Sequence, residues 1–208
     1  PCPYHELLER SIPFVTIKRA STIPCNSELP DFSTDDALGI RTAVAHLHEL
    51  GHTRIALITG RTHIVPAQRK ADAFTLIMEE LVGERSPIIE ETFYTYEAAA
   101  ARTPGLLERG VTAIVTGSDL QAIGAIDAIR SMGLSVPEDI SVIGFDDSFL
   151  MSHLSPSLTT IHQPVTSIVT SAVDTLFGAM ATPDYVSTHA DHLFPPDLVV
   201  RATTAPIS

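Results

Sequence analysis

Two adjacent carboxylates, Asp146 and Asp147, directly follow a short apolar segment at residues 140–145. A short apolar run with β-branched residues is typical of a strand buried on both faces, and Gly144 allows close backbone approach near its end. Open α/β sheets bind their ligands at the carboxyl ends of such strands. We therefore expect Asp146 to accept hydrogen bonds from a polar ligand. A turn or helix-capping role is the alternative for both carboxylates.

Other reactive residue types lack the spacing that chemistry would need. His46, His48 and His52 are close in sequence, but only His48 and His52 share a helix face. Residues 117–124 lack the Lys-Ser/Thr end and the glycine density of a phosphate loop, and no Ser, Cys or Thr has a recognisable nucleophile context. We predict no catalytic residue, no metal site and no cofactor.

Composition limits the class of protein. The 208 residues are 44% hydrophobic and 18% charged, enough for a sizeable core. The net charge of −12, with only 13 Lys and Arg, argues against a nucleic-acid surface on this chain. Cys2 and Cys25 are expected to be free thiols, with a single bridge as the alternative. No secretory signal and no membrane-length apolar stretch is visible, which predicts a cytoplasmic protein.

Strand and helix patterns alternate along the chain, which predicts an α/β fold with parallel sheets flanked by helices. The strands are expected at 13–17, 54–59, 87–92, 111–116 and 140–145. The helices are expected at 5–10, 37–50, 66–81, 96–108, 119–132 and 163–180. Residues 20–34 are polar and contain prolines, so we expect a loop there. The tail, 192–202, reads as two strands separated by a Pro-Pro break.

Several segments, taken in order, resemble the effector-binding domain of LacI/GalR-family transcription regulators. They are PFVTI (13–17), Asp35-Asp36, HLHELGHTRIALITG (46–60), residues 112–148 ending in GFDDS, LTTIHQP (158–164) and LVVRATT (198–204). The resemblance covers the chain from about Pro13 to its end. It implies a two-lobed, periplasmic-binding-protein-like fold with the effector in the cleft between the lobes. The implied N-terminal subdomain is 1–36 plus 163–182, and the implied C-terminal subdomain is 37–160 plus 190–208.

The resemblance also implies which residues meet the effector. In the family, the first Asp of the GFDD motif, here Asp146, grips hydroxyls of a sugar or nucleoside-like molecule. The partner donor is an Arg four residues before an aromatic side chain. Counting back from Phe74 gives Lys70, with Arg69 one place off. Lysine cannot copy the fork of an arginine, and a solvated basic pair on an exposed helix face is the alternative for both.

Four further residues fall at implied contact positions. Ser118 stands where the family usually has an Asn that reaches the ligand, and capping of the following helix is its alternative role. Tyr94 matches an aromatic that stacks on the ligand, with a core position as the alternative. Asp35 or Asp36 would offer a second hydroxyl partner at the cleft rim, although turns and caps commonly use such residues.

Two family features have no counterpart in this chain. Nothing resembles a helix-turn-helix, and the β-α-β-α-β stretch expected upstream of PFVTI is not present. We therefore expect a longer protein or a truncated product whose first lobe is incomplete, since a parallel strand without neighbours leaves backbone groups unsatisfied. The resemblance implies a homodimer that meets DNA only through a helix-turn-helix absent from this chain, with no membrane contact. A transporter's sugar-binding protein and a nucleoside hydrolase are the rival interpretations.

Overall fold

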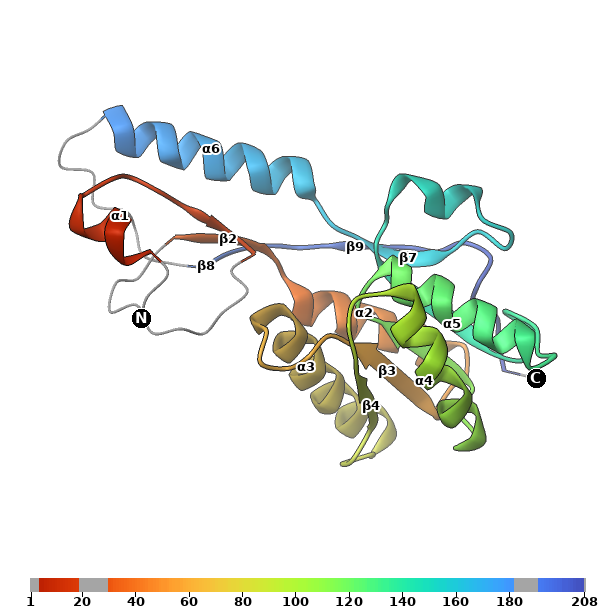
Figure 1. Cartoon of the computed structure of the whole chain (residues 1–208). Helices are drawn as coiled ribbons and strands as arrows, with labels where there is room; N and C mark the ends of the chain where they lie inside the picture. Colours follow the sequence, from red (N-terminus) through yellow and green to blue (C-terminus); the bar gives the residue numbers. More distant parts are fainter. Residues whose placement is uncertain (1–3, 19–29, 182–190, 208) are drawn as a thin grey trace.

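The computed structural model describes residues 4–18, 30–181 and 191–207 and arranges them in two α/β lobes (Figure 1). The smaller lobe contains a three-stranded parallel sheet in the order β1-β2-β8. Its strands are β1 (Thr16–Ile17), β2 (Asp31–Thr34) and β8 (Asp191–Phe194). Helix α1 (His5–Glu9) precedes β1. Helix α6 (Val165–Ala181) packs on this sheet, with Ile168 and Ala172 buried against Phe32.

The larger lobe contains a six-stranded sheet in the order β4-β3-β5-β6-β7-β9. Its strands are β3 (Ile55–Thr59), β4 (Ile88–Glu91), β5 (Ala113–Thr116), β6 (Ser141–Asp146), β7 (Thr159–His162) and β9 (Asp197–Val199). The pairs are parallel except for β9, which runs antiparallel to β7. Parallel neighbours bring the carboxyl ends of β3, β5 and β6 to one edge of the sheet, which is where ligands bind in this architecture.

Helices cover both faces of the six-stranded sheet. They are α2 (Asp36–Glu49), α3 (Val65–Val82), α4 (Tyr96–Glu108) and α5 (Asp119–Ser131). Because strand side chains alternate between faces, Ile55 and Leu57 of β3 join the core with α2 and α3, while Ala56 and Ile58 join the core with α4 and α5. This two-sided burial explains why the strands read as continuous apolar runs.

The predicted α/β fold is confirmed, but the loop predicted at 20–34 is wrong at its end, where β2 forms. The strand escaped prediction because its buried side chains are largely polar. Asp31 accepts hydrogen bonds from Thr16 Oγ1 at 2.9 Å and from Ser33 Oγ at 2.6 Å. Polar side chains that satisfy one another can be buried without an apolar pattern. Cys2 and Cys25 lie outside the described residues.

The tail forms the two strands predicted around Pro195-Pro196, but they belong to different sheets. Strand β8 pairs with β2 in the smaller lobe, and β9 pairs with β7 in the larger lobe. The sequence had assigned 190–208 as a whole to the C-terminal subdomain. The difference arises because a Pro-Pro break interrupts strand pairing and so allows the chain to pass from one sheet to the other within two residues.

Two of the three histidines considered for metal binding, His46 and His52, have structural partners. His46 Nε2 lies 3.2 Å from Thr204 Oγ1. His52 Nδ1 lies 3.0 Å from Thr112 Oγ1, and His52 Nε2 lies 3.0 Å from the carbonyl oxygen of Ala205. These contacts attach the end of α2 and the following turn to the C-terminal segment and to Thr112 before β5. Within the described residues, no helix is long and apolar enough to cross a membrane.

Close packing of α4 on α5 generates a prediction at Gly124. A Cβ atom there would lie 2.2 Å from the carbonyl oxygen of Tyr96. Gly124→Ala should therefore lower the free energy of unfolding by about 2 kcal/mol or more, because the backbones must separate. Helix propensity alone predicts the opposite sign, a gain of about 1 kcal/mol. Urea denaturation measures the difference.

Gly105→Ala is the matched control on α4, because a Cβ atom at Gly105 meets nothing within 4 Å. This substitution should stabilise the chain by about 0.5–1 kcal/mol. If both alanine variants were stabilised alike, the close approach of the two helices would be incorrect.

Candidate functional site

A strained turn presents the two adjacent carboxylates at the end of β6. The backbone φ angle is +123° at Asp146 and +56° at Asp147. Side chains other than glycine rarely adopt such values, and each costs on the order of 1–3 kcal/mol. Such strain persists only where the surrounding contacts enforce it.

Asp119, at the start of α5, enforces this turn. Its Oδ2 atom accepts hydrogen bonds from Ser148 N at 2.8 Å and Ser148 Oγ at 2.6 Å, and its Oδ1 atom accepts one from Thr160 Oγ1 at 2.6 Å. The carboxylate is buried, and burial is the main cause that raises its pKa above the ordinary value. Asp119 therefore joins the residue after the turn to α5 and to β7.

Asp147 has structural partners. Arg201 Nη2 donates to its Oδ1 atom at 2.7 Å, and His162 Nδ1 lies 3.1 Å from its Oδ2 atom. Arg201 also donates through Nη1 to the carbonyl of Leu158 at 2.7 Å. These contacts fit the turn role that was the alternative for Asp147.

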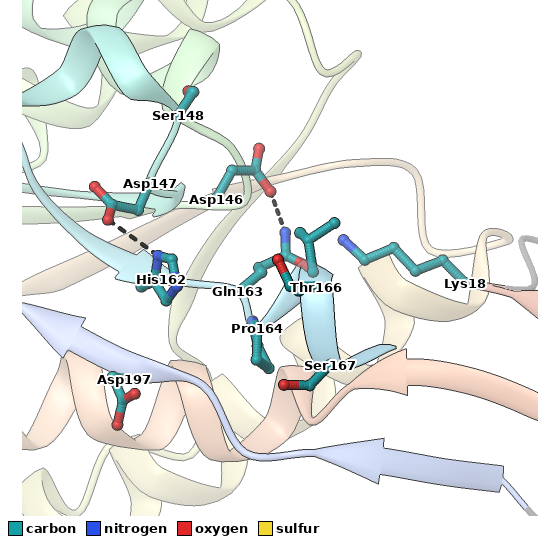
Figure 2. Close-up of a pocket in the computed structure, with 11 residues that line it drawn as sticks. Lys18, Asp146, Asp147, Ser148, His162, Gln163, Pro164, Thr166, Ser167 and Asp197 are labelled. Carbon is teal, nitrogen blue, oxygen red and sulfur yellow. Dashed lines mark hydrogen bonds and ion pairs between the residues drawn. The ribbon is translucent and has the colours of Figure 1, made fainter. Parts of the chain in front are cut away.

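The Asp146 carboxylate lies where the two lobes meet. Gln163, in the crossover between β7 and α6, donates through Nε2 to Asp146 Oδ1, as Figure 2 shows. The amide oxygen of Gln163 accepts a hydrogen bond from Thr34 Oγ1 of β2 at 2.7 Å. A continuous chain of hydrogen bonds thus runs from the smaller sheet to the larger one.

Several charges act on Asp146. Desolvation, followed by repulsion from Asp119, raises the pKa of Asp146 to about 6, although Lys18, Lys70 and the Gln163 hydrogen bond act in the opposite direction. Lys18 reaches the same region from the end of β1, and desolvation lowers its pKa. Lys18 itself has a φ angle of +51°. Strain and altered pKa values therefore coincide at the interlobe junction, a combination typical of functional sites.

Two cavities adjoin at this junction. The first compartment has a volume of about 500 Å³ and is lined by Ile64, Pro66, Lys70, Tyr94 and Ser118, among others. The second compartment, shown in Figure 2, has a volume of about 630 Å³ and extends past His162 to Thr166, Ser167 and Asp197. Both compartments include Lys18, Asp146, Ser148 and Gln163. Each has the size of a small-molecule site, for which about 300–1,000 Å³ is typical.

Lys70 and Arg69 take different positions. Lys70 lines the first compartment, where its ammonium group forms a buried ion pair with Asp36 Oδ1 and lies 4.1 Å from the centroid of the Phe145 ring. Arg69 instead pairs with Asp191 Oδ2 of the smaller lobe at 2.5 Å. The structure thus brings Lys70 to the cavity, while Asp36 lies buried behind it and lines neither compartment, and Arg69 connects the two lobes at its side.

Of the remaining predicted residues, Tyr94 and Ser118 line the first compartment and Asp35 does not. Tyr94 lines the first compartment, with its ring against the backbone of Gly60 and Gly117. Ser118 lines this compartment and also caps α5, since its Oγ atom accepts a hydrogen bond from Gln121 N at 3.3 Å. Asp35 lines neither cavity. It caps α2 by accepting a hydrogen bond from Leu38 N at 2.9 Å.

Sequence reasoning missed Lys18, Gln163 and Ser148 as cavity residues. Lys18 follows strand β1 directly, so the rule that identified Asp146 at a strand end could also have identified Lys18. Gln163 belongs to the LTTIHQP segment, which marks a crossing between lobes. Ser148 gave no signal, because its place depends on the strained turn.

The chain matches the family described as "Periplasmic binding protein-like domain" over residues 44–204. It is 41% identical over 209 residues to an uncharacterized HTH-type transcriptional regulator in the aml 5′ region of Streptomyces limosus, covering 99% of this chain and 58% of that protein. It is 39% identical to the HTH-type transcriptional regulator MalR of Streptomyces coelicolor, covering 97% of this chain and 59% of that protein. The chain thus spans less than two thirds of the length of these relatives.

Solved structures show the same fold. A LacI transcriptional regulator from a Rhodococcus species is 33% identical, with a TM-score of 0.83 over 98% of this chain and 74% of that chain. The transcriptional regulator CelR in complex with cellobiose is 26% identical, with a TM-score of 0.85 over 95% of this chain and 60% of that chain.

The buried ion pair generates a prediction about stability. Lys70→Met should lower the free energy of unfolding by about 3–5 kcal/mol, because Asp36 is left as a buried charge without its partner. The double variant Asp36→Leu/Lys70→Met should recover most of this loss. Chemical denaturation of the three proteins tests the pair. Equal stability of the single variant and the parent chain would contradict the pairing.

The raised pKa of Asp146 generates a prediction about pH. Its folded-state pKa of about 6 lies above the ordinary value of 3.8. The folded chain therefore favours the protonated carboxyl, and the free energy of unfolding falls as Asp146 ionises between about pH 4 and pH 6. Asp146→Asn should therefore raise the Tm at pH 7 by less than about 4 °C, a limit that allows for solvent screening at the cavity. The gain should fade on acidification from pH 6 to below pH 4.

Thermal melts between pH 3.5 and 8 measure this effect. Asp72→Asn removes a negative charge from the exposed face of α3 and controls for the change in net charge. A Tm gain for Asp146→Asn that is independent of pH would contradict the role of desolvation.

Proposed function

We propose that this chain, which belongs to the periplasmic-binding-protein-like domain family of LacI-type transcription regulators, is an effector-sensing domain. Its ligand would be a small sugar or nucleoside-like molecule. The observation that carries the proposal is the Asp146 carboxylate, held in a strained turn at a cavity between two lobes. Ionised carboxylates make strong hydrogen bonds to hydroxyl groups. An effector rich in hydroxyls suits such a site.

The residues around Asp146 support binding of a polyol. Tyr94, Ile64 and Pro66 offer an apolar side to the first compartment, which suits the C–H face of a sugar ring. On the polar side, Asp146 accepts, Lys18 donates, the Ser118 hydroxyl can donate, and the Ser148 hydroxyl, which donates to Asp119, can accept. Lys70 takes the place that the resemblance gives to an arginine donor, and Asp36 holds its ammonium group in a buried ion pair. Arg69 is assigned to interlobe contact instead.

The proposed mechanism is closure of the two lobes around the effector. The Thr34–Gln163–Asp146 hydrogen bonds and the Arg69–Asp191 ion pair join the lobes, so a ligand at Asp146 is placed to shift their relative position. A signal requires that the effector bind one arrangement more tightly than the other. In a homodimer, such a shift would reach DNA through a helix-turn-helix segment, as the names of the HTH-type relatives indicate for those proteins.

The named relatives favour a regulator over a transport protein or an enzyme. Both are described as HTH-type transcriptional regulators, and the similar structure that contains cellobiose is also a transcriptional regulator. For this chain we accordingly propose a role in control of transcription, with a carbohydrate as the first effector class to test.

Substitution of Asp146 tests the proposal directly. A panel of sugars and nucleosides is first screened by thermal shift, because a ligand that binds only the folded state raises the Tm. For any hit, Asp146→Ala should weaken binding by about 30-fold or more in calorimetry, since hydrogen bonds to a charged group are lost. Asp72→Ala, on the exposed face of α3, should bind like the parent chain. Unchanged affinity in Asp146→Ala would refute the site.

A further inference from the structure

Lysine is rare in this chain and lies only at the interlobe cavity. Of the 13 basic residues, only Lys18 and Lys70 are lysines, and both line the first compartment. An arginine side chain always stays protonated, whereas a lysine that is taken out of water can release its proton and react as an amine. The chain therefore confines its side-chain amines to one cavity.

The two lysines differ in their partners. The Lys70 ammonium group is engaged in the buried ion pair with Asp36. In the part of the chain that the structure describes, the half-buried Lys18 ammonium group forms neither a hydrogen bond nor an ion pair. Figure 2 shows this group directed toward Gln163 and Thr166, which line the second compartment. Lys18 is therefore the amine that a ligand can reach.

The surroundings of Lys18 favour a neutral amine. Desolvation is the main cause that lowers its pKa, and the charge of Lys70 adds to this effect, while the carboxylates of Asp146 and Asp36 act in the opposite direction. The backbone of Lys18 has a φ angle of +51°, and its N–H donates to the carbonyl of Phe32 at 3.1 Å, so the strained residue is still fixed to β2. A desolvated lysine close to a second cation is an arrangement that produces an amine nucleophile.

Asp146 offers a group that can exchange a proton with this amine. Its Oδ1 atom accepts the Gln163 hydrogen bond, while its Oδ2 atom has no hydrogen-bond partner among the described residues. Its pKa of about 6 is close to neutral, the range in which a carboxyl group both takes up and returns protons. Lys18 and Asp146 line the same two compartments, and a bridging water molecule is a common route for proton transfer between such groups.

We propose that Lys18 is a capture site for small neutral aldehydes, which it binds as a reversible imine with Asp146 as the proton carrier. This inference does not depend on the proposed function. The Lys18 ammonium group gives one proton to Asp146, and the amine nitrogen then bonds to the carbonyl carbon as the C=O π electrons move to the oxygen. A second N–H proton passes to that oxygen, which gives a carbinolamine. Asp146 returns its proton to the new hydroxyl group, which leaves as water while the nitrogen lone pair forms the C=N bond of the protonated imine.

Reductive trapping on the 208-residue chain tests this site, with glycolaldehyde as the probe. Sodium cyanoborohydride converts each imine into a stable secondary amine, and mass spectrometry of the peptides locates it. At about pH 7.5, Lys18 should be labelled about tenfold or more faster than Nα-acetyl-lysine methylamide in the same solution, because more of its amine is unprotonated. Lys70 should be labelled more slowly than this reference amine, because its ion pair is buried.

Two variants separate proton transfer from the effect of charge. Asp146→Asn removes a negative charge, which by itself would lower the pKa of Lys18 further and speed the labelling. If Asp146 carries the proton, labelling of this variant should instead fall about tenfold or more. Asp72→Asn, on the exposed face of α3, is the charge-matched control and should be labelled like the parent chain.

Circular dichroism checks that both variants are folded. The inference is overturned if Lys18 reacts no faster than the reference amine, or if Asp146→Asn is labelled as fast as the parent chain or faster. The sensing function stands in either case, because it is tested by effector affinity.

Discussion

The hydrogen bonds that the buried carboxylate of Asp119 accepts fix the turn that carries the cavity residues Asp146 and Ser148. The chain leaves β6 through two successive non-glycine residues with positive φ, a conformation that an unsupported loop would relax. Ser148, the next residue, donates both its amide and its hydroxyl to Asp119, whose other oxygen binds Thr160. Because Asp119 lies in the first turn of α5, the start of this helix is coupled to the direction in which Asp146 points.

The lobes are joined by specific side chains as well as by the connecting chain. Gln163 has only one amide group, and it is divided between Thr34 in one sheet and Asp146 in the other. Any movement that separates Thr34 from Asp146 must break or reorganise one of these bonds. A ligand that competes for Asp146 therefore acts on the same atoms that fix the lobes. Under the proposed function, this geometry would supply the differential contact that coupling between a site and a distant domain requires.

Local patterns predicted the elements and part of the site, and contacts distant in sequence account for the rest. Helices α2 to α5 were predicted to within one residue at each end, because apolar periodicity and stop residues such as Gly51 and Gly83 are local signals. Asp146 followed from its place at a strand end. Neither the Lys70–Asp36 pair nor the lobe-spanning contact of Arg69 could be predicted, because each depends on how separate elements pack. Strand β2 was missed because its buried side chains hydrogen-bond to one another.

Features that lower the stability of the folded chain, strained backbone and desolvated charges, concentrate around the cavity. Three of the four non-glycine residues with positive φ in the described part of the chain, Lys18, Asp146 and Asp147, line the second compartment. Partial desolvation also disfavours the charged forms of Lys18 and Asp146 there, although the Asp146 side chain is open to the cavity. The apolar clusters on both faces of the larger sheet supply the stability that tolerates these costs. Packing alone would favour relaxing strained backbone and desolvated charges, so their concentration in one place supports the proposed binding site.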